Sequence, residues 1–161
     1  MRIKTIGMTA AAVVATAIAG GAASGPAVNS LWYQRLRKPS YQPPRQAFPI
    51  VWPLLYGDIA LVSADTIDRL TDDGDDDAAR RFCAALAMNL VLNASWSWVF
   101  FNRHHLGFAA LTAGALTASS VDLTRRAIAV GQQGAAPLAA YPAWCAFATA
   151  LSTHIWWLNR R

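Results

Sequence analysis

Five long apolar segments follow one another along the chain, and short polar stretches separate them. Each is about 20 residues or longer, the length that an α-helix needs to cross the hydrocarbon core of a bilayer. The pattern therefore predicts an all-α integral membrane protein with a bundle of five transmembrane helices. The single membrane domain, residues 1–161, is expected to hold helices at about 4–27, 46–68, 79–101, 105–124 and 136–158, with a loop over 28–45.

Composition agrees with a membrane location. The chain is 55% hydrophobic and only 14% charged, whereas an ordinary soluble domain has about 25% charged residues. Its formal net charge is +5, but the cations lie scattered at helix ends, so we expect no nucleic-acid partner. Arg2 and Lys4 before the first apolar run also fit a signal peptide. That run exceeds the roughly 7–15 apolar residues of such a peptide, and we expect a retained helix.

The loop between the first two predicted helices is rich in proline, aromatic and basic residues. Residues 32–56 read WYQRLRKPSYQPPRQAFPIVWPLLY. Proline fixes φ and restricts the residue before it, so Pro39, Pro43 and Pro44 should stiffen this loop, residues 28–45, which we call the strap. We expect the strap to cover one end of the bundle. Its cations Arg37, Lys38 and Arg45 are candidate contacts for ligand carboxylates.

Orientation is harder to predict. Five spans place the two termini on opposite sides, and the 14 Lys and Arg residues divide evenly, seven and seven, between those sides. The strap is the most densely basic short loop, which favours a cytoplasmic strap and C-terminus.

Polar residues inside the predicted spans need partners, because hydrocarbon supplies none. Asn89 and Asn93 share a helical face with Trp96. These amides either bond to another helix or line a cavity that holds water or ligand, and both alternatives stay open. Asp58 in the second span is either a functional acid or a structural acid that a neighbouring helix satisfies.

Aromatic positions on the second, third and fifth predicted helices can converge beneath the strap. An apolar pocket with few polar groups is typical of sites for flat hydrophobic ligands. A porphyrin, with an apolar ring and propionates at one edge, fits such a pocket beneath basic residues. The candidate ligand-binding residues are Tyr33, Phe48, Trp52, Tyr56, Asn89, Asn93, Trp96, Tyr141, Trp144, Phe147, Ala148 and Leu151.

The sequence contains few signs of catalytic, metal-binding or redox sites. The chain has no P-loop, GxSxG, HExxH or CxxC motif, so we expect a binding protein with no metal site and no obligatory cofactor. His105 and His154 could meet as haem ligands, although interfacial histidines are the favoured interpretation. Cys83 and Cys145 lie at different depths, so we expect no disulfide. Small residues at four-residue spacing on the first and fourth helices fit tight packing or a homodimer.

Three blocks of sequence resemble the translocator protein family, also called the tryptophan-rich sensory proteins. They are WYxxLxKPxxxPP followed by FPIVWPLLY over 32–56, NASWSWVFF over 93–101, and Trp144, Phe147, Ala148, Leu151, Trp156 and Asn159. The resemblance implies a five-helix membrane bundle, often dimeric, in the bacterial inner membrane, with strap and C-terminus cytoplasmic. It implies a pocket beneath the strap for porphyrins, sterols or benzodiazepine-type drugs, lined by Trp52, Tyr56, Asn89, Asn93, Trp144, Phe147 and Ala148.

The resemblance also implies alternative functions. Some family members promote light-dependent porphyrin breakdown, which makes Trp52 and Trp144 candidate redox residues. A carrier of tetrapyrroles or other lipophiles is a further alternative, with Asp58 as its coupling acid. The chain departs from the family at Tyr41 and Ser152, where Trp and Asn are usual, and its C-terminal segment lacks the Tyr of a sterol-recognition pattern. We therefore expect a receptor or sensor for porphyrin rather than for sterol.

Overall fold

The computed structural model describes residues 2–131 and 137–160, and these contain helices and no β-strand. The predicted all-α class is therefore confirmed. The long helices are α1 (Ile3–Ala27), α3 (Phe48–Asp72), α4 (Asp76–Ser97), α5 (Leu106–Ala129) and α6 (Ala140–Asn159). The short ones are α2 (Leu31–Arg35), the 3₁₀ turns η1 (Arg45–Ala47) and η4 (Pro137–Ala139), and the π-helical turn η2 (Trp98–Asn102).

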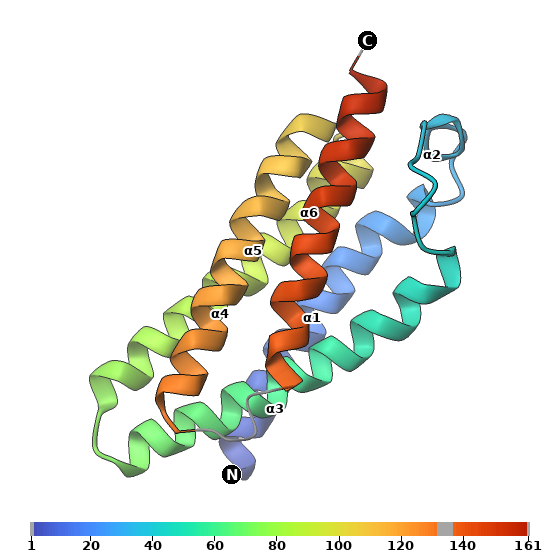
Figure 1. Cartoon of the computed structure of the whole chain (residues 1–161). Coiled ribbons are helices and arrows are strands. Elements are labelled where there is room, and N and C mark those ends of the chain that lie inside the picture. The colour runs from blue at the N-terminus through green and yellow to red at the C-terminus, as the bar shows by residue number, and fades with distance from the viewer. Residues whose placement is uncertain (1, 132–136, 161) are drawn as a thin grey trace.

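The long helices run up and down through one elongated bundle (Figure 1). The N-terminus lies at the same end as the α3–α4 connection, and the strap and the C-terminus lie at the opposite end. Helix α1 packs against α3 and α4, α4 packs against α5, and α5 packs against α6. This arrangement places the strap over the end at which α3 begins and α6 finishes.

Four stretches are long and apolar enough to cross a membrane: Ile3–Ala27, Arg45–Asp72, Asp76–Asn102 and Leu106–Ala129. At most 33% of each tested window is buried, so their outward apolar side chains, such as Leu54 and Leu111, suit contact with lipid. Helix α6 has 20 residues, but its Tyr, Trp and His residues lower its mean hydropathy. The protein is an integral membrane protein, and four of the five predicted spans are supported.

Helix α4 begins at Asp76, three residues before the predicted start, and two other helices end later than the apolar pattern predicts. Helix α3 continues to Asp72 instead of residue 68, and α5 continues to Ala129 instead of 124. Hydrophobicity marks where the hydrocarbon ends, whereas a helix can continue into water when its polar residues pair. The Arg69 Nε–Asp65 Oδ2 pair at 2.9 Å and the Arg126–Asp122 pair join neighbouring turns in this way.

The strap is less extended than its prolines predict. Ser30 Oγ accepts a hydrogen bond from the Tyr33 backbone N–H at 3.2 Å and thereby caps α2. The helical turn of α2 fits before the first proline of the strap, Pro39, and no proline interrupts it. The strap therefore consists of a short helix followed by a proline-rich segment that returns to α3.

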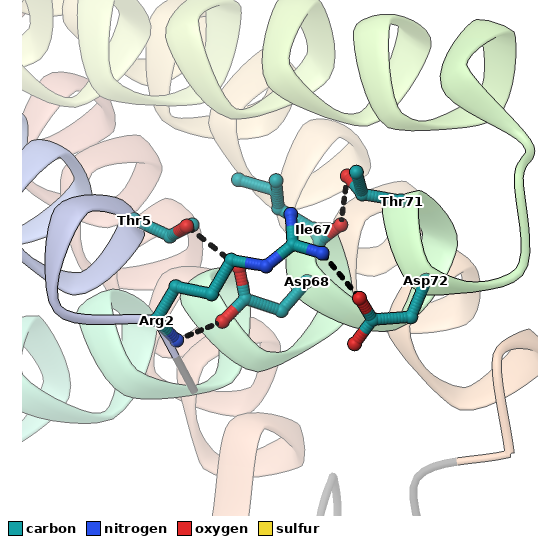
Figure 2. A network of polar contacts seen from close by, with 6 residues as sticks. All are labelled: Arg2, Thr5, Ile67, Asp68, Thr71 and Asp72. Carbon is teal, nitrogen blue, oxygen red and sulfur yellow. Dashed lines mark hydrogen bonds and ion pairs between the residues drawn. The ribbon is translucent and has the colours of Figure 1, made fainter.

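The lower end of α1 is fixed by a carboxylate from α3 (Figure 2). Asp68, only 4% exposed, accepts hydrogen bonds from the Arg2 backbone N–H and, at 2.6 Å, from the Thr5 hydroxyl. The Arg2 guanidinium pairs with Asp72. A carboxylate stabilises the unpaired N–H groups and positive dipole at a helix N-terminus. Helix α1 is thereby an integral part of the bundle.

Candidate functional site

Aromatic side chains of α3 and α6 meet beneath the strap. The rings of Phe48 and Trp144 lie edge to face with centroids 5.9 Å apart, and Trp144 lies 5.5 Å from Phe147. On α3, Trp52 and Tyr56 are 5.3 Å apart. All five are only partly buried. These five residues, which we call the aromatic site, thus have ring surface available to a ligand.

The strap packs on this site and on the neighbouring aromatic residues of η2. The Tyr41 ring lies 6.3 Å from Phe147, edge to face. The Tyr33 ring lies 5.8 Å from Phe101, and Trp32 lies 6.0 Å from Phe100. The strap therefore contacts aromatic residues from two sides of the bundle end, as the predicted lid requires.

Trp96 and Leu151 belong to a second cluster behind the aromatic site. Trp96 stacks on Phe100 at 5.6 Å, and its indole N–H donates to Ser152 Oγ at 3.2 Å. Leu151 and Phe100 are buried in this cluster, against which Phe48 and Phe147 also pack. The π-helical turn η2 brings the adjacent Phe100 and Phe101 into the same cluster, with ring centroids 4.8 Å apart. Phe48 and Phe147 therefore connect the two groups of predicted residues.

The two amides of α4 bond to other helices, which is one of the two alternatives that the sequence left open. Tyr56 Oη donates to Asn93 Oδ1 at 2.8 Å, and Asn93 Nδ2 donates to Tyr141 Oη at 3.1 Å. Tyr141 Oη donates to Asn89 Oδ1 at 2.8 Å, and Asn89 Nδ2 donates to Ser119 Oγ at 3.2 Å. This amide network joins α3, α4, α5 and α6. Its members form the polar base of the aromatic site.

Because the network is buried, each of its polar groups needs a hydrogen-bond partner within the protein. Asn89 and Tyr141 are 0% exposed and Asn93 is 3% exposed. An unpaired amide or hydroxyl at such positions carries a desolvation penalty with no compensating bond. Tyr56 contributes its hydroxyl to the network and its ring to the aromatic site. Direct contact of a ligand with Asn89, Asn93 or Tyr141 stays a prediction.

Two of the three predicted lid cations hold the strap together. Lys38 Nζ donates to the Tyr33 carbonyl at 2.5 Å and lies 4.1 Å from the Tyr33 ring centroid. Burial, with a smaller contribution from Arg45, lowers the pKa of Lys38. Arg45 donates to the Val28 carbonyl and to Asn29 Oδ1. The third cation, Arg37, is exposed and forms no ion pair with any described residue.

The strap is also bound to the end of α6. The Arg37 N–H donates to Asn159 Oδ1 at 3.0 Å, and Asn159 Nδ2 donates back to the Arg37 carbonyl at 2.9 Å. Tyr41 Oη lies 3.1 Å from His154 Nδ1. The motif that contains Asn159 is visible in the sequence, but its partner in the strap, 122 positions away, is not.

The histidines are engaged with aromatic residues instead of with one another. His154 contacts Tyr41, and His105 packs against Phe108 with centroids 6.3 Å apart. His104 stacks on Trp32 of the strap at 3.8 Å. The described residues contain no group of three or more His, Cys, Asp or Glu side chains that could hold a metal ion. These contacts favour interfacial histidines.

Small residues and cysteines have structural positions. A Cβ added at Gly107 would lie 3.1 Å from Trp156, and one at Gly114 would lie 3.9 Å from Thr149. The small-residue face of α5 therefore brings α6 close. Cys83 and Cys145 are free thiols, as predicted.

Asp58 lies on α3 within the membrane-spanning region. Its Oδ2 atom is buried and has no hydrogen-bond partner among the described residues. A partnerless carboxylate oxygen in such a position is expensive. Asp58 therefore remains a candidate for a function rather than an evident part of the scaffold.

Comparison with known proteins agrees with this architecture. A model of the TspO/MBR family matches residues 8–158. The uncharacterized membrane protein YtaB of Bacillus subtilis is 30% identical over 92% of this chain and 94% of its own length. The tryptophan-rich protein TspO of Bacillus cereus is 26% identical over 82% and 83%. The translocator protein of Homo sapiens is 31% identical over 78% and 73%. The chain belongs to the TspO/MBR family.

Proposed function

We propose that this protein is a membrane receptor or sensor that binds porphyrin and related flat hydrophobic ligands at the aromatic site. The observation that carries the proposal is the meeting of partly buried aromatic rings from α3 and α6 directly beneath the strap. Phe48, Trp144 and Phe147 form a continuous series of ring contacts that Tyr41 of the strap completes. Tilted and edge-to-face rings present the faces and edges on which a planar aromatic ligand packs.

Charge at the strap end supports the choice of an anionic ligand. Arg35 and Arg37 of the strap, Arg103 after η2 and Arg160 after α6 are exposed there. The sequence places no acidic residue in the strap, in residues 98–106 or after residue 122. The propionates of a porphyrin can therefore meet cations that no carboxylate of this end neutralises.

The membrane arrangement is part of the proposal. We place α6 in the membrane as the fifth span, beside α5, and the strap and C-terminus on the cytoplasmic side of a bacterial inner membrane, as a homodimer. The dense basic charge of the strap supports this orientation. Fusion of a reporter that fluoresces only in the cytoplasm to the C-terminus tests it. A fusion that is expressed normally but does not fluoresce would place the C-terminus on the other side of the membrane and contradict this orientation.

Titration of the purified protein with protoporphyrin in the dark, followed by tryptophan fluorescence, tests the binding site. We expect saturable quenching that weakens in Trp144→Phe and in an Arg37→Gln/Lys38→Gln double variant. Trp98→Phe is the matched control, because Trp98 lies on η2 and bonds to the Ala19 carbonyl of α1. Linear quenching that is equal in all variants would show that porphyrin only partitions into the detergent, and the proposal would fail.

A carrier is the second candidate, and Asp58 is the observation that favours it. A carboxylate with a buried, partnerless oxygen in a spanning helix can couple proton movement to transport. Porphyrin flux into liposomes should then depend on the pH gradient and fall in Asp58→Asn. Flux that is indifferent to both changes would exclude this role.

A further inference from the structure

A groove lies on the side of the bundle between α1, α3 and α4, far from the strap. It encloses about 220 Å³ and is lined by residues from all three helices. Its base is formed by Ile67, Leu86 and Leu90, each less than 10% exposed. The one hydroxyl in its lining, Thr9 Oγ1, already donates to the Ala60 carbonyl at 2.9 Å. The groove therefore offers an apolar surface without free polar groups.

Small side chains at the rim create the hollow. Ala12 on α1 and Ala87 on α4 both line it and are exposed, as is Met8. Its lining on α4 runs from Cys83 to Leu90, about 10 Å along a helix that rises 1.5 Å per residue. The groove is open at its rim, where Met8, Ala12 and Ala87 are exposed to the hydrocarbon side. A void there would forfeit dispersion contacts with its lining.

Near the end of the groove closest to the membrane surface lies Lys4, a cation without an ion pair in the described part of the chain. Lys4 precedes Met8 by four residues and so lies one turn below it on the same face of α1. Helical side chains tilt towards the N-terminus, which directs the ammonium group towards water. Arg2 and Arg80 nearby are paired with Asp72 and Asp77. Lys4 forms no ion pair with any described residue.

We propose that this groove is a binding site for one phospholipid, with an acyl chain between Ala12 and Ala87 and the phosphate at Lys4. An apolar groove and, at its interfacial end on α1, a cation without an ion pair match the two chemical parts of a phospholipid. The site lies at the opposite end of the bundle from the aromatic site and does not depend on porphyrin binding.

Native mass spectrometry of the detergent-solubilised protein tests the groove directly. We expect wild type to retain one phospholipid when phosphatidylglycerol or phosphatidylethanolamine is added. Ala87→Phe should abolish this retention, because the ring fills the slot. Ala115→Phe on α5 is the matched control, since Ala115 is also exposed and lies outside the groove. Equal retention in both variants, or equal loss, would mean that the lipid is only part of the surrounding annulus and would overturn the proposal.

Removal of the cation tests the phosphate contact. Lys4→Gln should weaken phospholipid retention about fivefold, the effect of one basic residue near a lipid headgroup. Diacylglycerol, which has the same chains and no phosphate, should bind wild type and Lys4→Gln equally. If Lys4→Gln retains phospholipid as well as wild type does, the phosphate assignment is wrong.

Cys83 in the groove supplies a second readout that needs no substitution. It is partly exposed, whereas Cys145 is 1% exposed, so alkylation by a maleimide reports on Cys83. Phospholipid should slow this alkylation, and diacylglycerol should slow it too. Unchanged alkylation would show an empty groove. A Cys83–Cys83 disulfide between two copies, formed readily in the presence of lipid, would assign the groove to a second copy of the chain and overturn the proposal.

Discussion

At the end of the bundle that holds the N-terminus, arginines and aspartates neutralise one another. Arg2 pairs with Asp72, and Arg80 pairs with Asp77. At the strap end the cations have no acidic neighbours in the sequence, and aromatic rings lie partly exposed beneath them. One end thus uses Asp68 and Asp72 to join α3 to the start of α1, whereas the other leaves charge and ring surface available. We therefore propose that substitutions at the end that holds the N-terminus change mainly stability, whereas substitutions at the strap end also change porphyrin affinity.

The largest expected effect comes from the paired end. Asp68→Ala removes a buried acceptor for the Arg2 N–H and the Thr5 hydroxyl and should lower the free energy of unfolding by about 3 kcal/mol. The measurement is unfolding in mixed micelles of increasing SDS content. Asp72→Ala is the control, because its exposed ion pair contributes about 0.5 kcal/mol or less. Equal losses in the two variants would contradict the role of Asp68 as the cap of α1.

A smaller loss is expected between the two ends. Asn93→Leu leaves the hydroxyls of Tyr56 and Tyr141 without one partner each. Hydrogen bonds between membrane helices contribute about 0.6 kcal/mol on average and up to about 1.7 kcal/mol, so we expect a loss of about 1–2 kcal/mol in the same assay. Ser95→Ala on the same helix is the control, since Ser95 makes no side-chain hydrogen bond to a described residue. An unchanged unfolding midpoint would mean that water forms the hydrogen bonds to Tyr56 and Tyr141 in place of the Asn93 amide.

At the strap end we expect ligand affinity to change as well as stability. Trp52→Ala should weaken porphyrin binding about tenfold, because it removes a ring contact and its buried area. Tyr56→Phe keeps the ring and loses only its bond to Asn93, so affinity should stay within about twofold. Fluorescence titration and SDS unfolding of both variants separate the two effects. If Tyr56→Phe loses as much affinity as Trp52→Ala, the hydroxyl contributes to binding and the ends are not independent.

The smallest effect concerns the strap at alkaline pH. Burial raises the pKa of Tyr33 above the ordinary value of a tyrosine, 10.0, although Gln42 and Arg45 lower it in part. A raised pKa means that the folded strap favours the neutral phenol. This contribution is fully present below pH 10 and is lost as pH rises through the folded pKa. The difference in ultraviolet absorption between wild type and Tyr33→Phe should show a phenol that ionises above pH 10. Ionisation below pH 10 would contradict the burial of Tyr33.

The long helices could be predicted from the sequence, because a long apolar segment in a bilayer can pair all of its own backbone N–H and C=O groups only as an α-helix. Partners could not be predicted in the same way. The spacing of Asn89 and Asn93 places them on one face, but which hydroxyls they meet depends on how α3, α5 and α6 are rotated. Serine is a common N-cap residue, so Ser30 could have indicated the start of α2. The prolines that follow it favoured an extended strap instead. Asp68 was missed because its partners precede it by more than 60 positions.

The contact between Asp68 and the start of α1 has a consequence for biogenesis. The start of α1 leaves the ribosome before Asp68 does, since Thr5 and Asp68 are 63 positions apart and the chain is made from its N-terminus. Until α3 inserts, the amide of Arg2 and the hydroxyl of Thr5 must be solvated by water or lipid headgroups. The first helix therefore enters the bilayer with one end unfixed, and its final depth is set only when the third arrives. The N-terminal helix is thus the first to be made, but its position in the bundle is fixed only after α3 has been made.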